Sequence, residues 1–121
     1  MIDFTEQDLD RFLAEDPGGP VVMLNVLRFR PGGGRERYAE YAAHVVPIAR
    51  PLGVEPIYFG NGGGALVAEG GETWDAVLLV RYPSRQVFAQ MIRDPRYQAG
   101  AHLRTEALEA AVLQPTTQVG G

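Results

Sequence analysis

The residue with the clearest potential for chemistry is Arg104, which follows Tyr97 near the C-terminal end of the chain. If the segment after Pro95 is helical, one helix face carries five residues in a stripe: Tyr97, Ala101, Arg104, Leu108 and Ala111. A guanidinium on an otherwise apolar face must meet an anion or several hydrogen-bond acceptors. Because its fork is planar and always charged, it suits a carboxylate or an enolate, and Tyr97 would add a hydroxyl at the same place.

Asn25 is a second polar residue in an apolar setting, since it lies in the middle of the run from Val21 to Phe29. Its amide has up to four hydrogen-bonding positions to satisfy. Either it bonds neighbouring backbone, or it points into a cavity between sheet and helices, where it would orient a carbonyl or stabilise an oxyanion. Arg104 also has a structural alternative, in which its head extends into water or pairs with one of three carboxylates: Asp75, Glu72 or Glu106.

Two more tyrosines are candidates to line such a pocket. Tyr41 lies on the apolar stripe of a predicted helix, and Tyr82 ends a predicted strand just before Pro83. Tyr82 and Trp74 have the alternative role of core or interface aromatics. Asp75 and Arg81 are expected to form ion pairs across strands or across a dimer. None of the candidate ligand-binding residues is assigned a catalytic step.

The other residues with chemical potential favour structural roles. His44 and His102 are the only histidines, and neither has a partner at metal-ligand spacing, so we predict no metal site; each keeps the alternative of a haem ligand or a general base. Ser84 is expected to cap a helix. The glycine-rich segment 60–64 is followed by a strand instead of a helix, which argues against a dinucleotide or phosphate loop. We therefore predict no cofactor.

Composition narrows the function classes. All 11 basic residues are arginine, so lysine Schiff-base chemistry is excluded, and the absence of cysteine excludes disulfides and thiolates. The net charge is −4 and no basic stripe is present, which argues against nucleic acid and anionic membranes as partners. The acidic N-terminus lacks the pattern of a signal peptide, so we expect a cytoplasmic protein.

The elements that must position these residues follow from periodicity and punctuation. Residues 1–19 are predicted to form an N-terminal helical arm, and residues 20–121 a single domain. Strands are expected at 21–29, 57–59, 65–68, 74–82 and about 112–114, with 57–59 and 65–68 forming either a hairpin or one bulged strand. Helices are expected at about 38–52, with a kink or early end at Pro47, and after Ser84 and Asp94.

Without the first helix, this order is β-α-β-β-α-β, the ferredoxin-like α+β pattern with a four-stranded antiparallel sheet and helices on one face. The strands at 21–29 and 74–82 are apolar on both sides, so the second face of the sheet also needs cover. A sheet-to-sheet homodimer that buries about 800 Å² or more per partner is the simplest answer.

The chain also resembles a known family. Residues 80–84 (VRYPS), Met91, residues 94–98 (DPRYQ) and Arg104, together with residues 23–29 (MLNVLRF) and the helix around Tyr38 and Tyr41, are similar to the DUF1330 family over about residues 20–115. The resemblance implies the dimeric α+β barrel superfamily and its sheet-to-sheet dimer. It implies no agreed activity, although distant relatives include cofactor-free monooxygenases, isomerases and haem-dependent enzymes. The N-terminal residues 1–19 exceed the family's core pattern.

Three functions follow as hypotheses, and one of them is purely structural, with the polar groups satisfied within the protein. The first is a cofactor-independent monooxygenase or isomerase that binds a small, partly apolar, anionic molecule between sheet and helices. The second is a non-catalytic ligand-binding or stress-associated dimer that uses the same pocket.

Overall fold

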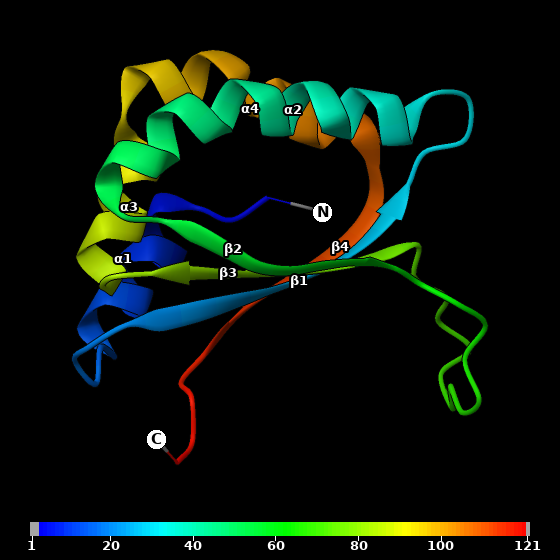
Figure 1. The fold of residues 1–121 in the computed structure, drawn as a ribbon, viewed down its shortest axis with the longest axis horizontal. Helices are drawn as coiled ribbons and strands as arrows, with labels where there is room; N and C mark the ends of the chain where they lie inside the picture. The colour runs from blue at the N-terminus through cyan, green and yellow to red at the C-terminus, as the bar shows by residue number, and fades with distance from the viewer. Residues whose placement is uncertain (1–2, 121) are drawn as a thin grey trace.

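The fold is a four-stranded antiparallel sheet with helices on one face. A computed structural model describes residues 3–120. The strands are β1 (Val21–Phe29), β2 (Glu55–Asn61), β3 (Ala76–Tyr82) and β4 (Leu108–Thr116), in the order β2-β3-β1-β4. Helices α2 (Gly34–Ala49), α3 (Arg85–Arg93) and α4 (Pro95–Ala107) lie on one side of this sheet (Figure 1). This arrangement confirms the predicted ferredoxin-like topology.

The helix boundaries follow the capping signals of the sequence. Ser84 accepts a hydrogen bond from the Val87 N–H at 3.2 Å, and Asp94 accepts one from the Arg96 N–H at 2.8 Å ahead of α4. Helix α2 continues through Pro47 to Ala49, where a 3₁₀ turn, η1 (Arg50–Leu52), follows. Gly53 ends that turn with a φ of 82°, a left-handed conformation that glycine adopts without strain.

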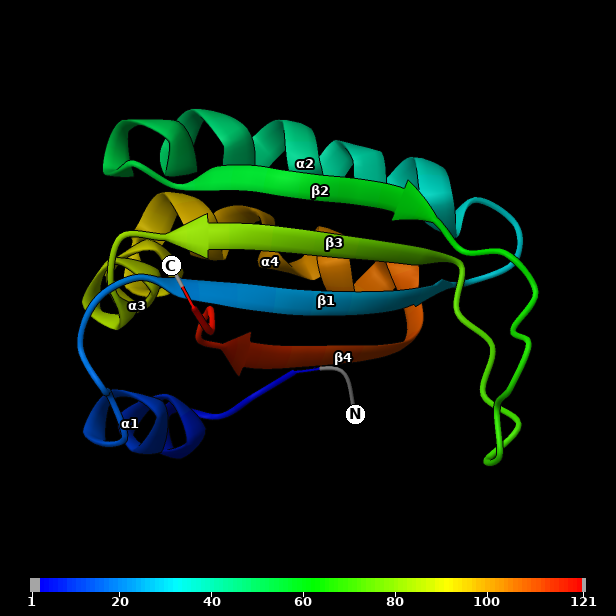
Figure 2. The same ribbon diagram turned by 60° about the horizontal axis from the view of Figure 1, so that its bottom comes forward.

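The prediction of a strand at 65–68 is wrong. The backbone N–H of Gly62 donates to the Asp75 carbonyl at 2.8 Å, and the β2–β3 pairing does not extend beyond this point. The residues between them form an arm that extends beyond the end of the sheet (Figure 2), with Leu66 fully exposed at 102%. Strand β3 therefore begins at Ala76 instead of Trp74, and β2 carries an irregularity between Pro56 and Tyr58.

The C-terminal helix is shorter than the apolar stripe predicted. Helix α4 ends at Ala107, and Leu108 and Ala111 belong to β4, which is longer than the predicted 112–114. Leu108 pairs with Phe29 and Ala111 with Leu27, so both residues are part of the sheet. Backbone pairing with β1 outweighs the helical propensity of this segment, as tertiary context commonly does.

The N-terminal helix α1 (Glu6–Ala14) is present as predicted. Thr5 and Asp8 form a capping box, with the Asp8 N–H donating to Thr5 Oγ1 at 3.1 Å. Leu9 is buried, and the rings of Phe4 and Phe12 pack against Phe88 of α3 at centroid distances of 6.1 and 5.3 Å. Figure 2 shows α1 beyond β4, which is an edge strand of the sheet.

The division of the chain at residues 19 and 20 stays a prediction, and residues 1–2 and 121 of those ranges lie outside the described part. None of the helices in residues 3–120 combines the length and apolar character needed to cross a bilayer.

Candidate functional site

All five residues predicted to bind a ligand line one cavity of about 300 Å³ between the sheet and the helices. They come from four elements: Asn25 from β1, Tyr41 from α2, Tyr82 from β3, and Tyr97 and Arg104 from α4. We call this cavity the tyrosine pocket. Its other lining residues are Asp3, Phe4, Thr5, Glu6, Phe88, Met91, Ile92, Gln98, Ala101 and Leu113. The pocket therefore combines an apolar wall with a larger set of residues that carry polar groups.

Helices α2 and α4 meet at the two tyrosines. The Tyr41 and Tyr97 hydroxyls lie 2.8 Å apart in a hydrogen bond, and their rings are edge-on at a centroid distance of 6.2 Å. Gly100, one turn after Tyr97, faces His44, one turn after Tyr41, and a Cβ on Gly100 would clash with the imidazole. His44 Nε2 lies 2.6 Å from the Arg96 carbonyl oxygen. The missing side chain at Gly100 thus allows the close helix approach that joins the tyrosines.

Asn25 and Arg104 are the two buried polar residues of the described chain, at 7% and 8% exposure. The Asn25 amide nitrogen donates to the Met23 and Leu78 carbonyls at 3.4 and 3.5 Å, which are long hydrogen bonds, while the side chain also lines the pocket. Asn25 therefore bonds neighbouring backbone and also lines the cavity, and its role toward a ligand stays a prediction.

Arg104 does not extend into water, and its guanidinium is engaged within the protein. Two of the carboxylates considered as its partners have other contacts. Glu106 forms an ion pair with Arg37 at 3.5 Å, and Asp75 accepts a hydrogen bond from the Phe29 N–H at 2.8 Å. Because Arg104 also lines the tyrosine pocket, its charge lies at the pocket wall.

Burial keeps the tyrosines protonated. It raises the pKa of Tyr97 and raises the pKa of Tyr41 well above its ordinary value, while the nearby Arg104 charge opposes both shifts. Burial also raises the pKa of Tyr82, and it raises the pKa of Tyr38, which packs beside Tyr41, to about 12. The three tyrosines that line the pocket, Tyr41, Tyr82 and Tyr97, therefore offer neutral hydroxyls at neutral pH, which can donate to an oxygen of a ligand.

Several lining residues were not predicted as site residues. Asp3, Phe4 and Glu6 belong to the segment that leads into and begins α1, and their distance from the rest of the site in sequence gives no signal of this proximity. Phe88 and Met91 lie three positions apart on α3, so the apolar face of that helix could have indicated them.

The remaining candidates lie away from the pocket. Arg81 pairs across strands with Glu55 at 3.5 Å, as predicted. Asp75 accepts a hydrogen bond from the Phe29 N–H, and an ion pair of Asp75 across a dimer stays a prediction. Trp74 lies outside the strand, under the Arg28 guanidinium at 5.4 Å. Within residues 3–120, no three His, Cys, Asp or Glu side chains gather closely enough to hold a metal ion.

The comparison with protein families identifies the chain. A family model described as "Domain of unknown function (DUF1330)" matches residues 33–114. The chain belongs to the DUF1330 family. The match includes the motifs at 80–84 and 94–98 and Arg104, whereas β1, which the predicted resemblance included, lies outside the matched range. A comparison with functionally curated proteins found no match.

Solved structures extend this relationship to the N-terminal segment. A protein of unknown function from Rhodopseudomonas palustris is 33% identical, with 99% of this chain and 98% of that chain covered and a TM-score of 0.92. The alignment therefore includes α1, which has a counterpart in this relative although the DUF1330 model starts later.

Two more distant structures share the fold. A dimeric ferredoxin-like protein of unknown function from Jannaschia sp. is 14% identical, with 83% and 100% coverage and a TM-score of 0.63. A second protein with the same description, from Thermobifida fusca, is 14% identical, with 84% and 93% coverage and a TM-score of 0.58. At this identity the likeness concerns the fold, and both structures are described as dimeric.

Proposed function

We propose that this DUF1330 protein is a homodimer that binds a small, partly apolar anion in the tyrosine pocket. The observation that carries the proposal is the convergence of Asn25, Tyr41, Tyr82, Tyr97 and Arg104 on one cavity from four separate elements. A buried guanidinium provides charge for a carboxylate or enolate, and protonated tyrosines donate hydrogen bonds to its oxygens. Phe88, Met91 and Leu113 would contact the apolar part of the ligand.

The same donors support an enzymatic form of this proposal. Stabilising an enolate or phenolate is the step that a cofactor-independent isomerase or monooxygenase needs, and Arg104 with Tyr97 would perform it. The alternative is a non-catalytic ligand-binding or stress-associated dimer. One observation favours the alternative: the carboxylates among the pocket residues described, Asp3 and Glu6, both belong to exposed positions of the N-terminal segment instead of the buried wall. An exposed carboxylate is a weak general base.

Binding is tested by isothermal titration calorimetry with phenylpyruvate and benzoate. Arg104→Met keeps the length of the side chain and removes its charge, so we expect binding to weaken by about 10- to 100-fold, the range for a charge-assisted hydrogen bond. Arg96→Met is the matched control, because Arg96 is on the same helix with a side chain 71% exposed. Equal binding by wild type and Arg104→Met would overturn the site.

Turnover separates the two forms of the proposal. Phenylpyruvate tautomerisation, followed by ultraviolet absorbance, and oxygen uptake with hydroquinone test isomerase and monooxygenase activity. Rates that fall in both Arg104→Met and Asn25→Ala would support an enzyme. Tight binding without turnover of any probe would support the non-catalytic alternative.

The proposed dimer uses the sheet face away from the helices. Leu24, Val26, Val77 and Leu79 alternate with the core-facing residues of β1 and β3 and are half-buried on this open face (Figure 1). The description of the two distant relatives as dimeric supports this assembly. Leu24→Arg would place a charge at its centre, so we expect the mass measured by light scattering to fall from dimer to monomer. Gln90→Arg, on the exposed side of α3, is the control, and a monomeric wild type would refute the dimer.

A further inference from the structure

A second cavity of about 390 Å³ lies between helix α1 and the sheet, beside the tyrosine pocket. Both cavities are lined by Asp3, Phe4, Phe88, Arg104 and Leu113. Because five side chains contribute to both linings, the cavities are neighbours across those residues. We call the second cavity the α1 groove.

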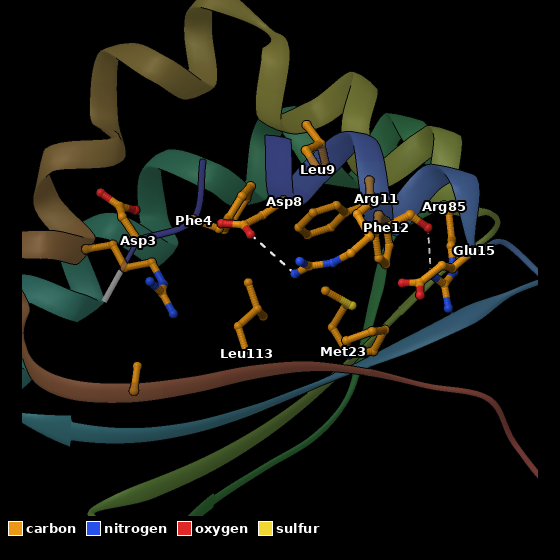
Figure 3. Close-up of a pocket in the computed structure, with 14 residues that line it drawn as sticks. Asp3, Phe4, Asp8, Leu9, Arg11, Phe12, Glu15, Met23, Arg85 and Leu113 are labelled. Atoms are coloured by element: carbon orange, nitrogen blue, oxygen red, sulfur yellow. Dashed lines mark hydrogen bonds and ion pairs between the residues drawn. The ribbon is translucent and has the colours of Figure 1, made fainter. Parts of the chain in front are cut away.

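The α1 groove is apolar along its floor, and two phenylalanine rings face this floor from the helix side. Met23 of β1 and Leu113 of β4 rise from the sheet toward Phe4 and Phe12 on the helix side (Figure 3). Ala111 and Pro115, the positions on either side of Leu113 along the same face of β4, extend this floor. Such a lining favours a hydrocarbon chain.

The charges around the groove are already neutralised by local contacts. Arg11 pairs with Asp8 at 3.2 Å. Arg85 lies 3.9 Å from the Asp16 carboxylate, which compensates its charge, and it also donates to the Phe12 carbonyl at 2.6 Å. These contacts leave little net charge to attract a second anion, so the groove complements the apolar part of a ligand.

We propose that the ligand of this site is an amphipathic anion with an elongated apolar chain. Its charged head lies in the tyrosine pocket near Arg104, and its chain passes Phe4 into the α1 groove between α1 and β4. This inference rests on the proposed function for the position of the head, and it adds the chemical class of the tail. Phe4 is half-buried against Phe88 in the segment before α1, so the shared wall includes a side chain that can change rotamer.

The test is calorimetric titration with straight-chain carboxylates from butanoate to dodecanoate. Each methylene that enters the groove contributes about 0.8 kcal/mol, so the affinity should rise about fourfold per carbon and then level off when the groove is full. An affinity that does not change with chain length would overturn the inference.

A substitution in the α1 groove tests whether the hydrocarbon chain of the ligand lies there. Ala111→Leu adds bulk to the floor at a residue that lines the groove but not the tyrosine pocket, so it should bring long-chain affinity down toward that of butanoate. Ala43→Leu makes the same change at an exposed position of α2 that lines neither cavity and should bind like wild type. Equal losses in both variants would count against the groove. The chain-length series on wild type decides the matter if Ala111→Leu does not fold.

Arg104→Met distinguishes the two proposals. If it weakens binding of every carboxylate, and chain length still raises affinity, both proposals stand. If it weakens binding but chain length has no effect, the tail assignment alone fails. If long chains bind equally well without Arg104, the proposed function fails, and the orientation of an amphipathic ligand fails with it.

Discussion

The close approach of Gly100 and His44 predicts that Gly100→Ala destabilises the wild-type protein but stabilises a His44→Ala variant. A Cβ on Gly100 would lie 2.5 Å from His44 Nε2, far inside van der Waals contact, so Gly100→Ala must displace the imidazole or separate α2 from α4. Displacement loses the 2.6 Å contact between Nε2 and the Arg96 carbonyl.

The expected change in the free energy of unfolding is the sum of three contributions. Alanine in place of glycine inside a helix stabilises by about 1 kcal/mol. The lost hydrogen bond costs about 1 kcal/mol and the overpacking about 1–3 kcal/mol. Gly100→Ala should therefore lower the free energy of unfolding by about 1–3 kcal/mol. In a His44→Ala background the obstacle is absent, and the same substitution should raise it by about 1 kcal/mol.

Urea unfolding followed by circular dichroism, at one fixed protein concentration, measures all four members of this double-mutant cycle. We expect a coupling energy of about 2–4 kcal/mol between the two positions. Equal effects of Gly100→Ala in both backgrounds, within about 0.5 kcal/mol, would refute the argument that Gly100 sets the separation of the helices that carry Tyr41 and Tyr97.

Three further predictions concern pH, charge and packing. Burial raises the folded-state pKa of Tyr38 to about 12 from 10.0. Its contribution to stability is therefore complete below pH 10 and is lost as the pH rises to 12, which lowers the free energy of unfolding by about 3 kcal/mol. Tyr38→Phe should remove this loss in urea titrations across the window, and an unchanged dependence of the unfolding free energy on pH would contradict the prediction. Asp3 lines both cavities with Arg104, so Asp3→Asn should tighten carboxylate binding about two- to fivefold in calorimetry, whereas weaker binding would show that Asp3 helps to hold the site. A Cβ on Gly34 would lie 2.6 Å from the Ala107 carbonyl oxygen, so Gly34→Ala should cost at least about 2 kcal/mol in urea unfolding, and a stabilised variant would count against that close approach.

The elements with strong periodicity and punctuation could be predicted from sequence. The apolar run at 21–29, the capping box at Thr5 and the Asp94-Pro95 start of α4 all depend on neighbours in the chain, and all three are in place. The end of α4 could not be predicted, because residues 105–111 contain no glycine or proline and favour a helix. Pairing with β1 decides this boundary, and pairing is a property of the assembled sheet.

The candidate site likewise combines residues that local patterns indicate and contacts that depend on the assembled fold. Asn25 and Arg104 were candidates because each is a polar residue in an apolar pattern, and both are buried. The hydrogen bond between Tyr41 and Tyr97 joins residues 56 positions apart, and the N-terminal segment reaches the pocket from outside the helices. Such long-range contacts depend on how α2, α4 and the segment before α1 pack, which local patterns do not specify.

The origin of the pocket residues in four elements has a consequence for how the folding of this protein responds to a ligand. No single helix or strand holds the polar set, so separating α4 from the sheet would dismantle the site along with the core around it. A molecule that binds there therefore binds the native state and not the unfolded chain. Mass action then stabilises the whole fold by about 2.7 kcal/mol at a ligand concentration 100 times Kd, which corresponds to a rise of roughly 10 °C in Tm for a domain of this size. A rise in Tm would therefore accompany binding of a compound in the pocket, whether or not a reaction follows.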